Sequence, residues 1–327
     1  MFVKDIGTTA YHPHGILDAI GNTPLVRLGC LSADVGHELH GKLEGMNPGG
    51  SAKDRAAMRM ILRALERGDI APGGMVIESS SGNMGIGLAY VCHVLKLRFT
   101  CVTDERTTLT NRRLIALYGA NLEVINQEDC SSCSLLERRL QRVQELLEEN
   151  PGSFWPNQYA NPDNAAAHRD TMREIVSALG GAPDYLFCAV STCGTLKGCM
   201  DYIAEHGLAT QVIAVDSVAS AIFGAVVGNR LIPGMGAAIV PPLCLSTTKP
   251  YCIRVSDKEI VRGCESALAK EGLLVGGSSG AVIAAYLAHA SSVPQGARCV
   301  LIFPDRGERY LDSVFCDEWL RANGLTG

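Results

Sequence analysis

The sequence lacks features that mark several classes of protein. No apolar run approaches the about 20 residues that a membrane-spanning helix needs. Residues 1–15 contain Lys4, Asp5 and two histidines and lack the apolar core of a signal peptide. The net charge of −5 and the pI near 5.9 argue against a general nucleic-acid-binding protein. We therefore expect a cytoplasmic protein that binds neither nucleic acid nor membrane.

Metal-binding and redox motifs are also scarce. The chain has 13 cysteines, an odd number scattered through expected strands and helices, and Cys130-x-x-Cys133 is the only pair at this spacing. No second pair or histidine follows at zinc-finger spacing. We expect reduced thiols and no metal, with Cys188, Cys193 and Cys199 as small packing residues.

Two nucleotide-binding signatures are missing. The loop Ser191-Thr192-Cys193-Gly194-Thr195 does not end in Gly-Lys-Ser/Thr, so it is not a P-loop. Gly234-Met235-Gly236 follows Pro233 rather than a strand, which argues against a dinucleotide site and nicotinamide chemistry.

The 327 residues, 47% hydrophobic and 19% charged with 35 glycines, are enough for one large or two modest α/β domains. Short apolar strands alternate with helical patterns, which predicts parallel sheets with crossover helices. A loop rich in Asn, Pro and Asp at 157–164 is the expected domain boundary. The expected strands are 39–44, 75–78, 98–102, 122–125, 185–190, 211–215 and 299–303, and the expected helices are 52–67, 86–95, 110–118, 135–149, 165–179, 195–205, 258–271 and one from Ser279.

Lys53 occupies an unusual place for a lysine. Asn47-Pro48-Gly49-Gly50 predicts a tight turn, and the amphipathic pattern that follows puts Lys53 in the first turn of a helix ending before Gly68. The helix dipole and partial burial both favour the neutral amine there. A neutral lysine condenses with aldehydes or accepts a proton, although a surface lysine beside Asp54 is the alternative.

Three glycine-containing loops lie where backbone N–H groups gather at helix starts. The loop 79–85 suits a carboxylate, the loop 191–195 suits a phosphate, and the loop 276–280 places a hydroxyl at a helix start. A reactive lysine, a phosphate site and a carboxylate site together point to pyridoxal phosphate as cofactor.

The chain resembles the fold-type II pyridoxal-phosphate enzymes related to cysteine synthase and cystathionine β-synthase, from Asn22-Thr23-Pro24 to Gly307-Glu308-Arg309-Tyr310. Asn47 to Arg55 resembles the segment whose lysine carries the cofactor, which implies this role and that of general base for Lys53. The resemblance implies further site residues: Ser80, Ser81, Gly82 and Met84 for the substrate carboxylate, Asn83 for the phenolic oxygen of the cofactor, Ser191, Thr192, Cys193, Gly194 and Thr195 for its phosphate, and Ser278 for its pyridine nitrogen.

The resemblance also implies an α/β, two-domain architecture. A smaller, movable domain at 46–157 would carry the carboxylate loop, and 1–45 with 158–327 would form a larger domain carrying the phosphate loop. The active site would lie in the cleft between them, and the protein would be a homodimer acting on small amino acids.

Departures from the family pattern bear on the substrates. Ser191 and Cys193 replace glycines, Gln158-Tyr159 replaces Gln-Phe, and Arg139 belongs to a helix usually preceded by small residues. Extra hydroxyls and arginines suit bulkier, more anionic substrates. This pattern resembles the branch that makes N-(2-amino-2-carboxyethyl)-L-glutamate from O-phosphoserine and glutamate, on the way to 2,3-diaminopropionate for siderophores and peptide antibiotics. It implies substrate contacts by Gln158, Tyr159, Ser191 and Arg139.

Three alternatives stay open. A cysteine or cystathionine synthase would use sulfide or a thiol, and a diaminopropionate synthase would use ammonia directly. A non-catalytic ligand sensor on the same scaffold is the alternative from a different class.

Overall fold

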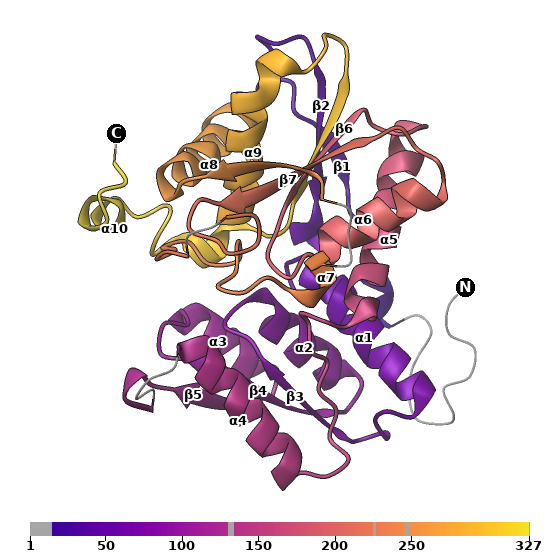
Figure 1. Cartoon of the computed structure of the whole chain (residues 1–327), viewed down its shortest axis with the longest axis vertical. Coiled ribbons are helices and arrows are strands. Elements are labelled where there is room, and N and C mark those ends of the chain that lie inside the picture. The colour runs from indigo at the N-terminus through magenta and orange to yellow at the C-terminus, as the bar shows by residue number, and fades with distance from the viewer. Residues whose placement is uncertain (1–14, 130–133, 225–226, 246–248, 327) are drawn as a thin grey trace. The chain divides into compact units, whose positions relative to one another are not determined.

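The computed structural model describes residues 15–129, 134–224, 227–245 and 249–326 (Figure 1). Contacts within the chain separate two compact units, Met1–Ile20 with Lys53–Asn164 and Gly21–Ala52 with Ala165–Gly327. The Cys130-x-x-Cys133 motif lies outside the described residues.

The first unit is built on a three-stranded parallel sheet of order β3-β4-β5. Its apolar core joins the sheet to the inner face of α4, where Val143 and Leu146 are buried against Ile77 and Val102. The strands are β3 (Met75–Ser79), β4 (Arg98–Asp104) and β5 (Asn121–Ile125), and the helices are η1 (Ile16–Ala19), α1 (Lys53–Arg67), α2 (Asn83–Val94), α3 (Leu109–Leu117), η3 (Gln127–Asp129) and α4 (Leu135–Glu149).

The second unit is built on a six-stranded sheet of order β1-β2-β9-β6-β7-β8, in which only the β1–β2 pair is antiparallel. The strands are β1 (Leu25–Arg27), β2 (Glu38–Leu43), β6 (Tyr185–Ala189), β7 (Gln211–Ser217), β8 (Tyr251–Val255) and β9 (Arg298–Phe303). The helices are η2 (Glu44–Met46), α5 (Pro162–Leu179, of which the part from Ala165 belongs to this unit), α6 (Gly194–Glu205), α7 (Pro242–Leu245), α8 (Asp257–Glu271), α9 (Gly277–His289), η4 (Ala290–Ser292), η5 (Gly307–Tyr310) and α10 (Asp317–Ala322).

Helices cover both faces of the larger sheet. Figure 1 shows α8 and α9 on one side and α5 and α6 on the other. Each side has its own buried cluster: Tyr286 of α9 packs with Phe187 and Leu301, and Leu196 of α6 packs with Leu186 and Val300. Because both faces are covered, β6 and β9 are almost continuously apolar.

The structure confirms the predicted α/β class and most predicted elements, including the helix 135–149 with identical bounds. The list of expected strands did not include β1, which pairs antiparallel with β2 and so adds an antiparallel pair to the predicted parallel pattern. Sequence analysis missed β8, an edge strand with exposed Tyr251 and Arg254 that does not form an apolar run.

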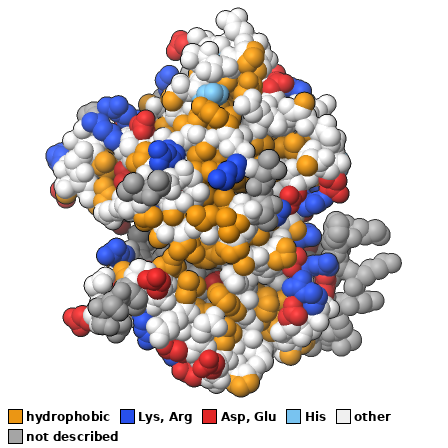
Figure 2. All heavy atoms as spheres, viewed as in Figure 1, with side chains coloured by type: hydrophobic (Ala, Val, Ile, Leu, Met, Phe, Trp, Pro, Cys, Tyr) orange, Lys and Arg blue, Asp and Glu red, His pale blue; other side chains and the backbone are white. Residues whose placement is uncertain are grey.

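Charged side chains of both signs are interspersed over the face shown in Figure 2. Within the part of the chain that the structure describes, no helix combines the length and apolar character needed to cross a bilayer.

Candidate active site

Lys53 is the first residue of α1 and follows a glycine turn held by its own backbone contacts. Gly50 has φ of +86°, and a Cβ there would lie 2.8 Å from Nη2 of Arg309, so the turn requires glycine. The N–H of Ala52 donates to the carbonyl of Pro304 at 2.8 Å. These contacts fix the chain immediately before Lys53, whose half-buried side chain matches its predicted place at a helix start.

The first turn of α1 packs closely on α2. A Cβ on Gly87 would lie 3.3 Å from the carbonyl oxygen of Lys53, so α2 lies directly against this turn. The neighbouring Asp54 is fully buried. The backbone of Lys53 is therefore held on a rigid helix rather than on a loop.

The predicted carboxylate loop is shaped by Ser80. Its buried Oγ accepts the N–H of Gly85 at 2.9 Å and that of Gly82 at 3.3 Å. Asn83 then begins α2, so the Ser80 hydroxyl bonds to an N–H of the first turn of that helix. Backbone N–H groups gathered at a helix start suit an anion. Met84 is buried in the packing of α2, which leaves little of it to contact a substrate.

Glu78 ties the segment containing Gln158 to this loop. Oε1 of Glu78 accepts the N–H of Ser79 at 2.8 Å and the indole N–H of Trp155 at 3.1 Å, and Oε2 accepts the N–H of Gln158 at 3.1 Å. Nε2 of Gln158 donates in turn to the carbonyl of Ser79 at 3.0 Å. Gln158 thus lies beside the loop, followed by the half-buried Tyr159.

Opposing effects act on the pKa of Glu78. Complete burial raises the pKa of its carboxyl to about 7, while the three N–H donors and the positive charge of Arg139 act in the other direction. Nε of Arg139 lies 3.2 Å from Oδ2 of Asp104, and both side chains are buried. Among the described residues, Nη1 of Arg139 has no hydrogen-bond partner.

The predicted phosphate loop joins β6 to α6 in the second unit. Cys193 adopts a left-handed conformation, with φ of +64°, at the N-cap position of α6, where it has no side-chain capping bond in the described structure. The N–H of Gly194 donates to the buried hydroxyl of Thr192 at 3.3 Å. A left-handed residue before an uncapped helix gathers N–H groups around an anion, so this donor set fits a phosphate.

Two hydroxyls of this loop already have partners. Oγ of Ser191 donates to the carbonyl of Gly236 at 3.3 Å, which engages the hydroxyl that we expected to contact substrate. Oγ1 of Thr195 lies 3.2 Å from Nε2 of His168, a residue that sequence analysis did not select.

Ser278 is buried in the first turn of α9. A Cβ on the preceding Gly276 would come within 2.0 Å of Oδ1 of Asp305, so only glycine fits there. The hydroxyl of Tyr310 donates to Oδ2 of Asp305 at 2.8 Å, and burial, followed by the Asp305 charge, raises the pKa of Tyr310. Asp305 thereby fixes the chain leading into Ser278.

Three of these segments meet at one edge of the six-stranded sheet. The strands β6 and β9 are parallel neighbours, so the phosphate loop and Asp305 follow them at the same edge. Ser51 forms a β-bridge with Asp305, and the N–H of Gly276 donates to the carbonyl of Asp305 at 3.2 Å. The turn before Lys53, the phosphate loop and the start of α9 are therefore brought together within the second unit.

Side chains of the types that bind metals, and the cysteine thiols, are the remaining reactive groups of the chain. Within the described ranges, no group of three or more His, Cys, Asp or Glu side chains is placed to hold a metal ion. The described cysteines form no disulfide with one another, and Cys188, Cys193 and Cys199 are buried as expected of packing residues.

Comparisons with known proteins identify relatives along most of the chain. A family model described as "Pyridoxal-phosphate dependent enzyme" matches residues 16–305. A protein of Ralstonia nicotianae named N-(2-amino-2-carboxyethyl)-L-glutamate synthase is 44% identical over 93% of this chain and 90% of its own length. A Cupriavidus metallidurans protein of the same name is 41% identical over 94% and 91%. A cysteine synthase structure from Entamoeba histolytica has a TM-score of 0.85 at 30% identity, covering 98% of each chain.

Proposed function

Because the chain belongs to the pyridoxal-phosphate dependent enzymes of fold type II, we propose that it catalyses β-replacement on O-phospho-L-serine with L-glutamate. The C–O bond to phosphate breaks, a bond forms between the β-carbon and the glutamate nitrogen, and that nitrogen loses a proton. The products are N-(2-amino-2-carboxyethyl)-L-glutamate and phosphate. The observation that carries this proposal is the 44% and 41% identity to two synthases named for this product.

The described residues suit the cofactor of this family. We propose that Lys53 binds it covalently, that the loop 191–195 holds its phosphate, and that Asn83 and Ser278 contact its ring. Bound pyridoxal phosphate draws electrons from the α-carbon of an amino acid and so lets a β-substituent leave. The neutral hydroxyl of Ser278 does not stabilise a charged ring nitrogen as a carboxylate does, which favours elimination over transamination.

Lys53 has a second task in this proposal. Once an amino acid takes its place, the freed amine accepts the proton from the α-carbon. The helix dipole at the start of α1 favours the neutral amine for this purpose. The loop of Ser80, Ser81, Gly82 and Asn83, with Gln158 beside it, binds and orients the substrate carboxylate.

The choice of nucleophile depends on donors beyond that loop, because glutamate brings two carboxylates and phosphoserine brings a phosphate. We assign this role to Tyr159, Ser191 and Arg139. The structure supports Arg139 because its buried Nη1 has no acceptor in the described residues and so retains a donor for an anion. Ser191 would have to exchange its bond to Gly236 for one to substrate.

We further propose a cytoplasmic homodimer with a movable smaller domain at 46–157, supplying 2,3-diaminopropionate for siderophores or peptide natural products. A cysteine or cystathionine synthase is the second candidate, and the similarity to the Entamoeba histolytica cysteine synthase structure favours it.

One competition experiment separates these functions. The purified protein, loaded with pyridoxal phosphate, is given phosphoserine or acetylserine and then glutamate, sulfide, homocysteine or ammonia, and products are identified by mass. We expect fastest turnover with phosphoserine and glutamate, and none with Lys53→Ala. Faster turnover of sulfide than of glutamate would contradict the assignment. Unchanged glutamate addition by Ser191→Gly and Tyr159→Phe would contradict the role of these hydroxyls.

A further inference from the structure

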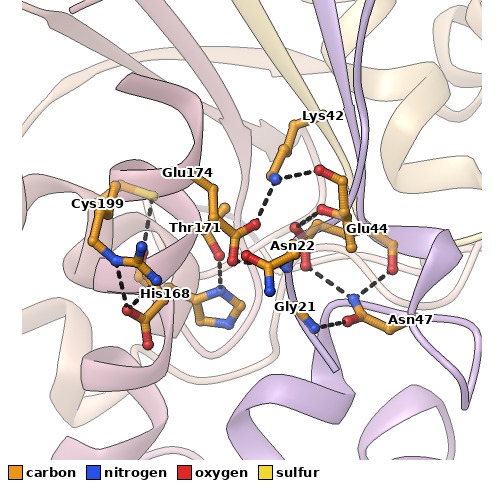
Figure 3. Close-up of polar contacts among 12 residues, drawn as sticks. Gly21, Asn22, Lys42, Glu44, Asn47, His168, Thr171, Glu174 and Cys199 are labelled. Carbon is orange, nitrogen blue, oxygen red and sulfur yellow. Dashed lines mark hydrogen bonds and ion pairs between the residues drawn. The ribbon is translucent and has the colours of Figure 1, made fainter. Parts of the chain in front are cut away.

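Helix α5 buries a histidine against the first turn of α6. His168 has no exposed surface, and its Nε2 lies 3.2 Å from Oγ1 of Thr195 in the phosphate loop. Its Nδ1 lies 3.2 Å from Oγ1 of Thr171, one turn further along α5 (Figure 3). A buried imidazole between two hydroxyls is therefore linked directly to a predicted phosphate ligand.

The approach of the two helices depends on a glycine in α6. A Cβ on Gly198 would lie 2.0 Å from the carbonyl of Ala165 and 2.8 Å from Cβ of His168, so any side chain would separate α5 from α6. One residue later, Sγ of Cys199 donates to the carbonyl of His168 at 3.7 Å. The backbone on both sides of the His168–Thr195 contact is thus closely packed.

A buried ion pair holds α5 itself. Nζ of Lys42 on β2 lies 2.6 Å from Oε2 of Glu174 and donates to the carbonyl of Thr23 at 2.7 Å, as Figure 3 shows for the Lys42–Glu174 contact. Both charged side chains are buried. Removing either partner would leave the other charge buried, so the pair fixes α5 against the sheet and His168 with it.

The number of hydrogen atoms that His168 and Thr195 can donate limits how the two side chains interact. A neutral imidazole has one N–H and one acceptor nitrogen, and a threonine hydroxyl has one hydrogen. If Nε2 accepts, that hydrogen is used on His168 and Thr195 cannot donate to an anion. If Nε2 carries the hydrogen, it donates to Oγ1 of Thr195, and the Thr195 hydroxyl is free to donate elsewhere.

We infer that His168 is a positioning residue that fixes the Thr195 hydroxyl as a donor to the cofactor phosphate. Thr171 donates to Nδ1 of His168, Nε2–H donates to Oγ1 of Thr195, and that hydroxyl donates to a phosphate oxygen. This inference rests on the proposed function, because it assigns the phosphate to the loop 191–195.

Two ligands that differ only in the phosphate test this inference. Dissociation constants for pyridoxal phosphate and for pyridoxal are measured for the wild type, His168→Leu and His168→Gln. The Ile175→Val variant on the same helix, also fully buried, controls for altered packing. We expect His168→Leu to weaken pyridoxal phosphate about tenfold or more, the usual effect of losing one hydrogen bond to a charged group, and to leave pyridoxal unchanged. His168→Gln, which keeps an N–H donor, should recover most of the affinity.

Nitrogen-15 NMR of the wild type gives a second readout, independent of variant folding. We expect His168 to carry its hydrogen on Nε2 when pyridoxal phosphate is bound. A hydrogen on Nδ1 alone, or an equal loss of affinity for both ligands in His168→Leu, would overturn the inference while leaving the proposed function intact. A wild-type protein that binds neither ligand would overturn both.

Discussion

Replacing Glu78 by glutamine should change how the stability of the protein depends on pH. The carboxyl is fully buried and has a pKa of about 7, with burial as the main cause of the rise from 4.5. Glutamine has nearly the same shape but does not titrate, so the comparison isolates the ionisation of this one group.

The size and sign of this change in stability follow from the pKa shift of Glu78. At about 1.4 kcal/mol per pKa unit, a rise from 4.5 to about 7 corresponds to about 3 kcal/mol. The folded chain binds the Glu78 proton more tightly than the unfolded chain does. Its contribution is therefore fully present below pH 4.5 and is lost as the pH rises through about 7. Relative to Glu78→Gln, the wild type should lose about 3 kcal/mol of unfolding free energy over this range.

Chemical denaturation of the apo-protein at intervals between pH 4.5 and 8.5 measures this difference. The matched control is Glu148→Gln, an exposed position on α4, whose difference from the wild type should stay nearly constant. Trp155, which donates to Glu78, provides a local probe: in a Trp319→Phe background its fluorescence should titrate near pH 7. A difference between wild type and Glu78→Gln that does not vary with pH would refute the reasoning and show that the N–H donors keep the carboxylate ionised.

Three further predictions concern the fixed elements of the site. Lys53→Ala should abolish the visible absorption band that forms when wild-type protein is mixed with pyridoxal phosphate, and a colourless wild type would refute the role of this lysine. Gly198→Ala should destabilise the protein by about 3 kcal/mol in thermal unfolding, because the added methyl group meets the Ala165 carbonyl. Lys42→Met should cost about 3–5 kcal/mol by leaving the Glu174 charge buried, and the Lys42→Met/Glu174→Met double variant should recover most of it; equal losses would contradict the buried-pair argument.

Features carried by neighbouring residues were predictable from the sequence. The turn before Lys53, the loop 79–85 and the loop 191–195 are each contiguous, so their glycines and hydroxyls indicated helix starts that the structure confirms for α1, α2 and α6. The sequence also shows that Cys193 stands where the family pattern has a glycine. Its left-handed φ of +64° was not predictable, because no neighbouring residue type requires it.

Contacts between distant segments were not predictable in this way. His168 is 27 positions from Thr195, and Glu78 is 80 positions from Gln158, so neither contact follows from local spacing. Only Gly198 gave a local signal, since a glycine inside a helical pattern often marks a close approach of another backbone. The burial of Arg139 beside Asp104 also depends on α4 packing on β4.

The order of strands in the larger sheet has a consequence for biosynthesis. Glu38 of β2 pairs with Arg298 of β9, 260 positions later, and β9 also joins the β1–β2 pair to β6. At about 5–20 residues per second, a ribosome delivers β9 roughly 10–50 s after β2. The parallel sheet of β3, β4 and β5 is complete by Ile125, so it can form during that interval. The edge of β2 meanwhile lacks its partner and is open to pairing with other chains. A chain released before Arg298 cannot close its larger sheet.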